Sequence, residues 1–432
     1  MDESEPPPGV VQRLLDRFVR FNPALCNPEW QGMSLTVRLR PPILEGLSRL
    51  AVFIVKEAAA PRLRAIGKPI LVAVGSQNNL NSARSALQRR DDFELVTFHN
   101  LRIEGCARIS MLGQYLTGLW ILALLPLLLI VERRQHVRRA MLARTDALVI
   151  TMGWGFGIRR FLTRTNPRAV VFMSALSSYH CLIIEQARKA GLPTVFLTHA
   201  PIGRGQVELP TDHALLDGEF QKTLFPTSAT RFAVTGSGRG KELAAAARDR
   251  SSAAGVLIAT NTLIRDLHEV EHLIRQLRER HGEIPCVIRP HPADRGRFEV
   301  HRELARRTGA RYQDPSNPLW FDADDCKFLV STQSGVILDA LLLGFFPLII
   351  RSPATDRVLM HGPDDYYGFA ELDLAREIDL ADPSLPLAWD AGRNLELLEK
   401  SADPTWDTYA AIEREFDSIL AQEGDRRERH EG

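Results

Sequence analysis

The chain has 432 residues, of which 54 are Lys or Arg, 53 are Asp or Glu and 45% are hydrophobic. This length and composition indicate two or three globular domains and exclude a disordered or fibrous protein. The net charge of +1 lacks the cationic excess with which proteins neutralise nucleic-acid phosphates, so we expect no nucleic-acid partner. The five cysteines never form a C-x-x-C pair, which predicts neither a disulfide framework nor a zinc site.

Residues 1–67 are expected to form a helical N-terminal extension without a repeat. They begin with an acidic, proline-rich stretch, which is the opposite of the basic start of an export signal. Together with the cysteine usage, this start predicts a cytoplasmic protein.

A first domain with alternating strands and helices is predicted over residues 68–236. Its opening βαβ unit consists of a buried strand (70–74), a polar turn (Gly75–Asn81), a helix (82–90) and a second strand (93–98). The other elements predicted in this domain are strands at 147–151, 169–173 and 194–197 and a helix at 179–190.

The glycine-rich run 236–240 ends this series, and a second domain is predicted over 237–385, followed by a helical tail over 386–432. The strands predicted in the second domain lie at 255–259, 286–289, 328–331 and 348–351. Strands that alternate with helices predict parallel sheets, so we expect the α/β class with two doubly wound, Rossmann-like domains. A ligand is then expected in a cleft between the domains, beside the carboxyl ends of the strands.

A long apolar segment, 111–131, interrupts the first series. It approaches the roughly 20 residues that a membrane-spanning helix needs. A spanning helix, a helix buried in the domain core and a helix lying in the lipid interface all remain open. The arginines that follow, up to Arg144, favour the third placement, because cations beside an apolar helix bind anionic headgroups. The sequence therefore predicts a peripheral contact through 111–144 with the inner face of the cell membrane.

The predicted second domain holds a histidine between two prolines. The strand 286–289 ends at Arg289 and runs directly into Pro290, His291 and Pro292. The prolines restrict the backbone, so His291 is held at the carboxyl end of a strand, where its ring can donate to a phosphate oxygen. A histidine between prolines is also typical of a capped turn that faces solvent.

A second motif follows the strand 328–331 and precedes a predicted helix. It comprises Ser331, Thr332, Ser334 and Gly335. Free amides at a helix start attract anions and the hydroxyls add donors, although serine and threonine are also ordinary N-caps. Asp339, one turn into the helix, is placed to accept from ribose hydroxyls. Because the two motifs are expected to end adjacent strands, they indicate a site for a nucleotide monophosphate or diphosphate.

The first domain is expected to bind the acceptor and to supply the base. The strand 194–197 leads into His199, whose imidazole titrates near neutrality and can take a proton from an attacking hydroxyl. A histidine bonded within its own loop fits the spacing equally well. Arg204 would help to bind the donor phosphates. The other candidates on the acceptor side are Gly75, Ser76, Asp212 and His213. The reserve candidates for the base are Asp212, His213 and Asp217.

Two further patterns resemble known sites but fit them poorly. Asp322 and Asp324 form a D-x-D, but they precede a strand, which is the wrong edge of a parallel sheet for a ligand. The run Gly153–Gly157 lacks the G-x-G-x-x-G spacing of a dinucleotide site. We interpret the first as a solvated turn and the second as a flexible turn on the acceptor side.

These motifs resemble those of two-domain GT-B glycosyltransferases, especially bacterial capsule and cell-surface polysaccharide transferases of the polysialyltransferase-like and CDP-glycerol glycerophosphotransferase-like kinds. The resemblance covers residues 70–369 and rests on 194–205, 234–237, 289–292 and 331–347. It implies that His291, Ser331, Thr332 and Ser334 bind the donor phosphates, that Asp339 binds its ribose, and that no metal is required. Arg289 and Gly335 are further candidates for binding the donor nucleotide. Polysialyltransferase-like enzymes carry an acidic base motif where this chain has His199, which argues against a sialic acid donor.

The resulting hypothesis is a metal-independent transferase without a cofactor. It would move a sugar, or a polyol phosphate, from a nucleotide-activated donor to a cell-surface or lipid-linked glycan. His199 and His291 are its candidate catalytic residues. A nucleotide-sugar epimerase of the UDP-GlcNAc 2-epimerase kind and a non-catalytic nucleotide-binding membrane adaptor are the alternatives.

Overall fold

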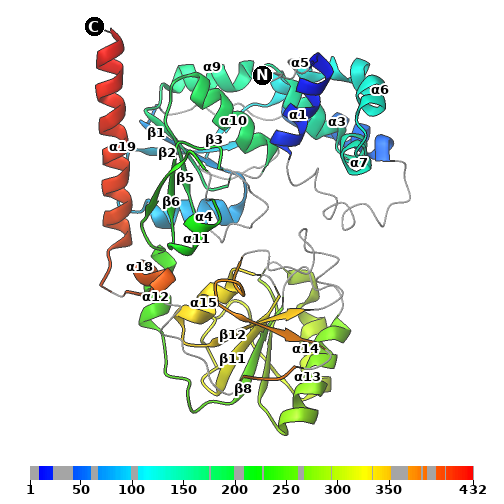
Figure 1. Ribbon diagram of the computed structural model, residues 1–432, viewed down its shortest axis with the longest axis vertical. Coiled ribbons are helices and arrows are strands. Elements are labelled where there is room, and N and C mark those ends of the chain that lie inside the picture. Colours follow the sequence, from blue (N-terminus) through cyan, green and yellow to red (C-terminus); the bar gives the residue numbers. More distant parts are fainter. Residues whose placement is uncertain are drawn as a thin grey trace, which may run out of the picture.

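The computed structural model describes residues 9–22, 42–59, 67–98, 106–174, 177–198, 209–225, 228–260, 267–292, 294–332, 334–351, 368–380, 383–386, 396–403 and 405–431. Two parallel sheets organise these residues into two domains, drawn one above the other in Figure 1. The expected α/β class with two Rossmann-like domains, a GT-B-like architecture, is therefore confirmed.

The first sheet has seven strands in the order β3-β2-β1-β4-β5-β6-β7, all parallel. They are β1 (Ile70–Val74), β2 (Phe93–Phe98), β3 (Ala107–Ile109), β4 (Ala169–Phe172), β5 (Thr194–Leu197), β6 (His213–Leu216) and β7 (Arg231–Val234). Val72 in the centre pairs in register with Leu95 and Val171. Central strands of this kind are apolar on both faces because helices cover both sides of a parallel sheet.

The second sheet has six parallel strands in the order β10-β9-β8-β11-β12-β13. They are β8 (Gly255–Ala259), β9 (Cys286–Arg289), β10 (Arg311–Tyr312), β11 (Cys326–Ser331), β12 (Phe346–Arg351) and β13 (Arg376–Asp379). The helices α13 (Leu267–His281) and α14 (Phe298–Thr308) cover one face. The helices α12 (Gly238–Ala245), α15 (Val336–Leu342) and α18 (Glu399–Ala402) lie on the other.

The strand predicted at 147–151 is wrong, because these residues belong to the helix α8 (Thr145–Met152). All eight of its residues are buried, among the helices α1 (Val10–Phe21), α3 (Pro42–Ala58), α5 (Leu112–Gly118), α7 (Gln135–Ala143) and α10 (Ser178–Lys189). A helix enclosed by other helices is apolar on all sides, which in sequence looks like a buried strand. The short strand β3 occupies the sheet edge instead.

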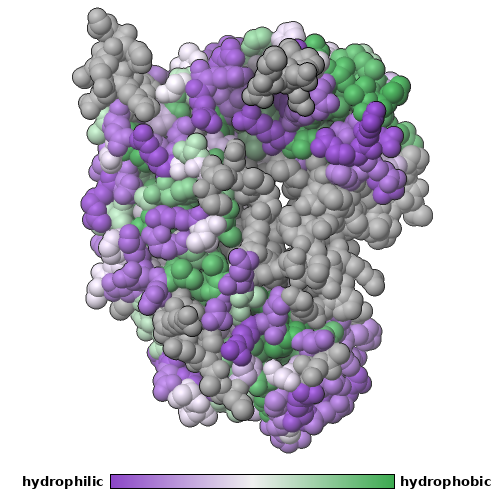
Figure 2. Space-filling view, in the orientation of Figure 1, coloured by the Kyte–Doolittle hydropathy of each residue, from purple (hydrophilic) through white to green (hydrophobic). Residues whose placement is uncertain are grey.

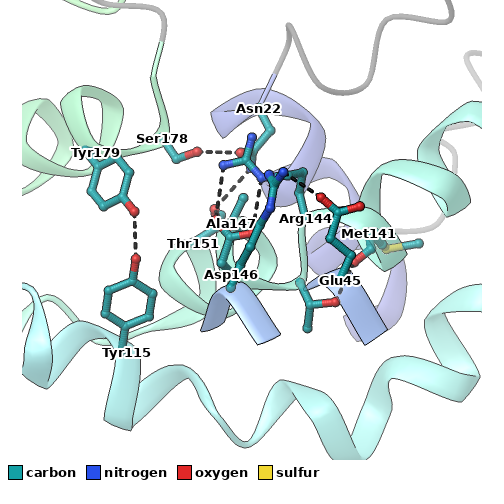
Figure 3. A network of polar contacts seen from close by, with 12 residues as sticks. Asn22, Glu45, Tyr115, Met141, Arg144, Asp146, Ala147, Thr151, Ser178 and Tyr179 are labelled. Atoms are coloured by element: carbon teal, nitrogen blue, oxygen red, sulfur yellow. Dashed lines mark hydrogen bonds and ion pairs between the residues drawn. The ribbon is translucent and has the colours of Figure 1, made fainter. Parts of the chain in front are cut away.

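The N-terminal helices, expected to form an extension, pack within the core of the first domain. A buried polar network holds α1 there (Figure 3): Asn22 donates to Thr151 Oγ1 over 3.1 Å and accepts from Ser178 Oγ. In the same region Arg144 pairs with Asp146 over 3.1 Å. Because these partners come from α1, α8 and α10, the network joins segments that are far apart in the sequence.

The apolar segment 111–131 forms two helices, α5 and α6 (Ile121–Val131), bent by 61° at the break between them. Taken together they meet the length and composition of a membrane span, whereas none of the described helices does so alone. Their inner residues Tyr115, Ile121, Leu125 and Leu128 lie in the core of the first domain. The segment therefore combines a core-packed side with an outward side.

Two stretches of chain connect the domains, and these stretches lie side by side. The first is the linker after β7, and the second, 400–403 and 405–407, leads into α19 (Thr408–Glu431), which runs along the first domain (Figure 1). In α19, Ile412 and Phe416 pack on the face of the first sheet that α4 (Gln77–Ala86) also covers. A Cβ on Gly236 would lie 2.9 Å from Lys400 O, and one on Gly240 would lie 2.8 Å from Ser401 O. The glycine-rich run therefore lets the second connection pack against the first.

Candidate functional site

The carboxyl ends of strands from both domains meet at the junction. Asp217 follows β6 of the first sheet, and Asp339 lies in α15 of the second domain. The short helix α11 (Phe220–Thr223) brings Phe220 into the core of the second domain, where its ring centre lies 6.5 Å from that of Phe369. This apolar contact holds the end of β6 against the second domain.

The Asp217 backbone is fixed on both sides. Its N–H donates to Gln221 Oε1 over 2.9 Å, and its carbonyl accepts from Ser401 Oγ over 2.7 Å. Burial raises the pKa of the Asp217 carboxyl to about 7, and the nearby negative charge of Asp339 adds to the rise. A carboxyl that titrates near neutrality is suited to general acid–base work.

Asp339 forms one ion pair and lies in the field of a second cation. Arg239, in the first turn of α12, pairs with it over 2.8 Å. Desolvation raises the pKa of Asp339, while the charges of Arg239 and Arg289 oppose that rise. The predicted ribose ligand is thus a partly buried member of a charged cluster, the junction cluster, formed by Asp217, Arg239, Arg289 and Asp339.

Arg289 is occupied by the protein itself. Its Nη1 donates to Gln313 Oε1 over 3.0 Å and to Asp314 O over 3.2 Å. Its Nη2 donates to Pro315 O over 3.2 Å and to Asn317 O over 2.8 Å. Both terminal nitrogens therefore order the loop after β10, which gives this predicted nucleotide-binding residue a structural role.

His291 lies two residues beyond β9, half-buried at the carboxyl edge. Its carbonyl accepts from Asp294 N–H over 2.9 Å. Burial lowers the pKa of His291, and the charge of Asp294 only partly offsets this. The neutral ring can donate from one nitrogen and accept at the other.

The helix α14 that follows His291 holds a buried histidine that the sequence reading missed. His301 donates from Nδ1 to Arg297 O over 2.8 Å, since a carbonyl can only accept, and its Nε2 lies 3.2 Å from Thr260 Oγ1. Thr260 follows β8, so His301 connects α14 to the end of that strand. The sequence signal that could have identified His301 is its place one turn into the helix that follows the strand before His291 and Pro292.

The hydroxyl motif after β11 divides into separate roles. Ser331 donates to Ala259 O over 2.8 Å inside the sheet, so its hydroxyl is used structurally. Ser334 Oγ accepts from Val336 N–H over 3.4 Å at the start of α15, where Gly335 is the N-cap. Thr332 Oγ1 is buried, and among the described residues no hydrogen-bond partner reaches it. Thr332 is thus the member available to a ligand.

The two motifs do not end adjacent strands, because β8 lies between β9 and β11. Ala259 and Thr260, at the end of β8, contact Ser331 and His301 respectively. The expectation of adjacency was wrong because strand order depends on crossover connections, which local sequence does not encode. Both motifs nevertheless lie on the same edge of one parallel sheet.

In the first domain, Gly75 and Ser76 lie at the carboxyl end of β1. Ser76 Oγ accepts from Asn79 N–H over 3.1 Å and caps α4, which explains why this helix begins before the predicted residue 82. A Cβ on Gly75 would lie 2.8 Å from the ring of His180. His180, which the sequence reading missed, is buried edge-on to Phe98 with ring centres 4.7 Å apart.

The other acceptor-side candidates are separated by the fold. Asp212 and His213 lie at the amino end of β6, on the edge opposite to Asp217. Asp212 accepts from Thr194 Oγ1 over 2.7 Å and pairs with Arg188 over 3.2 Å. His199 and Arg204 lie outside the described residues.

The two poorly fitting patterns have structural roles. Asp322 pairs with Arg311 over 3.1 Å and, like Asp324, is exposed before β11. In the run Gly153–Gly157, Gly155 is the left-handed N-cap of α9 (Phe156–Thr165), and its N–H donates to Gln114 Oε1 over 2.6 Å. Within the described ranges, no three His, Cys, Asp or Glu side chains are grouped to hold a metal ion.

No protein-family model matches the chain, and no curated protein matches its sequence. Solved structures with a similar fold include the UDP-GlcNAc 2-epimerase from Methanocaldococcus jannaschii, with 10% identity and a TM-score of 0.44, covering 82% of this chain and 99% of that one. An O-GlcNAc transferase from Thermobaculum terrenum has 12% identity and a TM-score of 0.41, covering 96% and 82%. The wall teichoic acid polymerase TagF has 10% identity and a TM-score of 0.39, covering 90% and 99%. These likenesses concern the fold alone.

Proposed function

We propose that the protein transfers a sugar or polyol phosphate from a nucleotide-activated donor to a cell-surface or lipid-linked glycan. The observation that carries this proposal is the meeting of Asp217 from the first domain with Asp339 of the second. Arg289, two residues before His291, interacts with the same Asp339, so the junction cluster links the candidate base to the candidate phosphate site. Such a meeting of strand ends from two α/β domains is where ligands of this architecture bind.

For a sugar donor, the chemistry assigns one role to each side. Asp217, ionised, takes the proton of the acceptor hydroxyl as its oxygen forms a bond to the sugar carbon. The bond from that carbon to the donor phosphate breaks, and the leaving phosphate oxygen keeps the electron pair. The neutral ring of His291 and the Thr332 hydroxyl are hydrogen-bond donors for that developing charge. Asp217 takes the role that sequence reading gave to His199.

The test begins with donor binding. Thermal unfolding of the full chain is measured with CMP-, CDP-, UDP- and GDP-linked donors, since specific binding raises the unfolding temperature. Nucleotide release is then followed with the best donor and a glycan acceptor. We expect His291→Ala to lower turnover by roughly 100-fold or more, while His268→Ala, at a site that is 86% exposed, leaves it unchanged.

Full activity of His291→Ala would remove the central assignment. Isomerisation of a donor in the absence of any acceptor would instead identify an epimerase. Binding of a donor without turnover under all acceptor conditions would identify a non-catalytic nucleotide-binding protein.

A further inference from the structure

The outward side of α5 and α6 is an apolar surface on the first domain. Its members are Leu116, Trp120, Ala123, Leu127 and Ile130. Leu116 lies on α5, Trp120 at the break, and the other members at helical spacing on α6, where Figure 2 shows a hydrophobic area at the upper right. Ile130 is 78% exposed. Because the inner side of the pair already packs in the domain core, these outer side chains contribute little to folding.

The turn at 153–157 adds two aromatic rings to this surface. Trp154 and Phe156 are 59% and 54% exposed, and their ring centres lie 5.7 Å apart, edge to face. The turn is fixed against α5, because Trp154 N–H donates to Thr117 Oγ1 over 3.1 Å. We call Leu116, Trp120, Leu127, Ile130, Trp154 and Phe156 the apolar patch. Tryptophan rings are characteristic of the boundary between headgroups and acyl chains.

The same part of the chain is strongly cationic. Residues 106–164 hold nine arginines and two carboxylates, a net charge of +7 in a chain whose total is +1. Both carboxylates, Glu132 and Asp146, are buried and paired with Arg134 and Arg144. The remaining cations include exposed arginines on both sides of the patch: Arg133, Arg138 and Arg139 near α7, and Arg159, Arg160 and Arg164 on α9.

We propose that the apolar patch and its flanking arginines bind the surface of an anionic lipid bilayer. The outer side chains of α6 and the rings of Trp154 and Phe156 would enter the interfacial region, while the arginines contact the headgroups. The inner side of α5 and α6 stays in the domain core, so the pair lies on the membrane and does not cross it. The net positive charge of residues 106–164 favours an anionic lipid surface over a protein partner of mixed charge. This inference does not depend on the proposed transfer reaction, since lipid binding needs neither donor nor acceptor.

The experiment is co-sedimentation of the full chain with vesicles of phosphatidylcholine alone and with 30% phosphatidylglycerol added. We expect binding to the anionic vesicles with a blue shift of tryptophan fluorescence, and much weaker binding to the neutral ones. Trp154→Ala with Phe156→Ala should weaken binding by about tenfold or more, because two exposed aromatic groups no longer enter the interface. Replacing Arg133, Arg138 and Arg139 by Gln should weaken it by roughly 100-fold at low salt.

The matched control is Val300→Ala with Phe321→Ala. These side chains are 51% and 53% exposed on the second domain and should leave vesicle binding unchanged. Thermal unfolding of each variant verifies its fold. Failure of the parent chain to bind anionic vesicles, equal binding by the Trp154 and Phe156 variant, or concentration-dependent self-association through the patch in place of lipid binding would each overturn the proposal.

Discussion

Asp217, at the end of β6, lies close enough to Asp339, in α15, for the two carboxyl charges to interact across the domain junction. Arg239 pairs with only one of them, Asp339, over 2.8 Å. Burial and the charge of Asp339 both disfavour the ionised form of Asp217. The pKa of Asp217 therefore depends on how the two domains meet.

The first prediction concerns stability and pH. The pKa of Asp217 in the folded chain is about 7, against about 4 for an unfolded aspartate. Between these values the folded state keeps a proton that the unfolded state has lost, so the free energy of unfolding falls as the pH rises from about 4 to 7. Asp217→Asn should remove this part of the fall and raise the free energy of unfolding at pH 8 by up to ~4 kcal/mol.

Urea unfolding at pH 5, 6, 7 and 8 measures the effect. Asp324→Asn, at an exposed carboxyl before β11, is the matched control and should follow the parent chain. A pH dependence in Asp217→Asn equal to that of the parent would show that this carboxyl does not titrate in the window.

A second prediction concerns the rate. If Asp217 is the base, kcat/KM should rise tenfold per pH unit below about pH 7 and level off above it, because only the ionised carboxylate accepts a proton. Asp217→Asn should lower kcat/KM by about 10²–10⁴-fold and lose this limb. If kcat/KM of the variant still rose with pH up to about pH 7, another group would be the base, and His199 would be the next residue to test.

Thr332 and Ser331 provide the third prediction, because neighbouring hydroxyls have opposite roles. Thr332→Val should leave the free energy of unfolding unchanged or higher, since its buried hydroxyl has no partner among the described residues, and should weaken donor binding by about fivefold. Ser331→Ala should cost ~1–3 kcal/mol, because Ala259 O loses its donor, and should leave donor affinity unchanged. Calorimetry with the donor and urea unfolding measure the two quantities. If Ser331→Ala weakened donor binding and Thr332→Val lowered the free energy of unfolding, the roles of the two hydroxyls would be the reverse of those assigned here.

The fourth prediction tests the helix that replaced a predicted strand. A Cβ on Gly118 in α5 would overlap Val149 O in α8, so Gly118→Ala should lower the free energy of unfolding by about 2–3 kcal/mol. In the same helix, a Cβ on Gly113 would lie 3.9 Å from its nearest neighbour, Gly157 N. Gly113→Ala should be neutral or stabilising, because alanine favours helix. Equal stability of both variants would contradict the close crossing of α5 and α8.

Sequence reasoning was most accurate where a short apolar run is bounded by turns. The strands at 70–74, 255–259 and 286–289 lie where they were predicted, since a buried parallel strand needs only local hydrophobicity. Thr145–Met152 has the same apolar character but is helical, because its surroundings are helices, and burial on every side overrides the preference of β-branched residues.

The candidate site was predicted less completely. The motifs at His291 and Thr332 were found because they follow predicted strands directly. Asp217 was named only as a reserve, and nothing local distinguishes it from Asp212, which flanks the other end of the same short strand. The fold separates them by placing one at each end of β6.

The sequence by itself determined the α/β class, the two domains and the two motifs at strand ends, because hydrophobic runs, glycines and prolines act on neighbouring residues. Only the tertiary structure decided that β8 lies between those motifs, that Arg289 is used by its own loop, and that Asp217 meets Asp339. Each of these facts depends on groups distant in the chain, and a carboxyl acquires a pKa near neutrality only from the desolvation and charges that such distant groups supply.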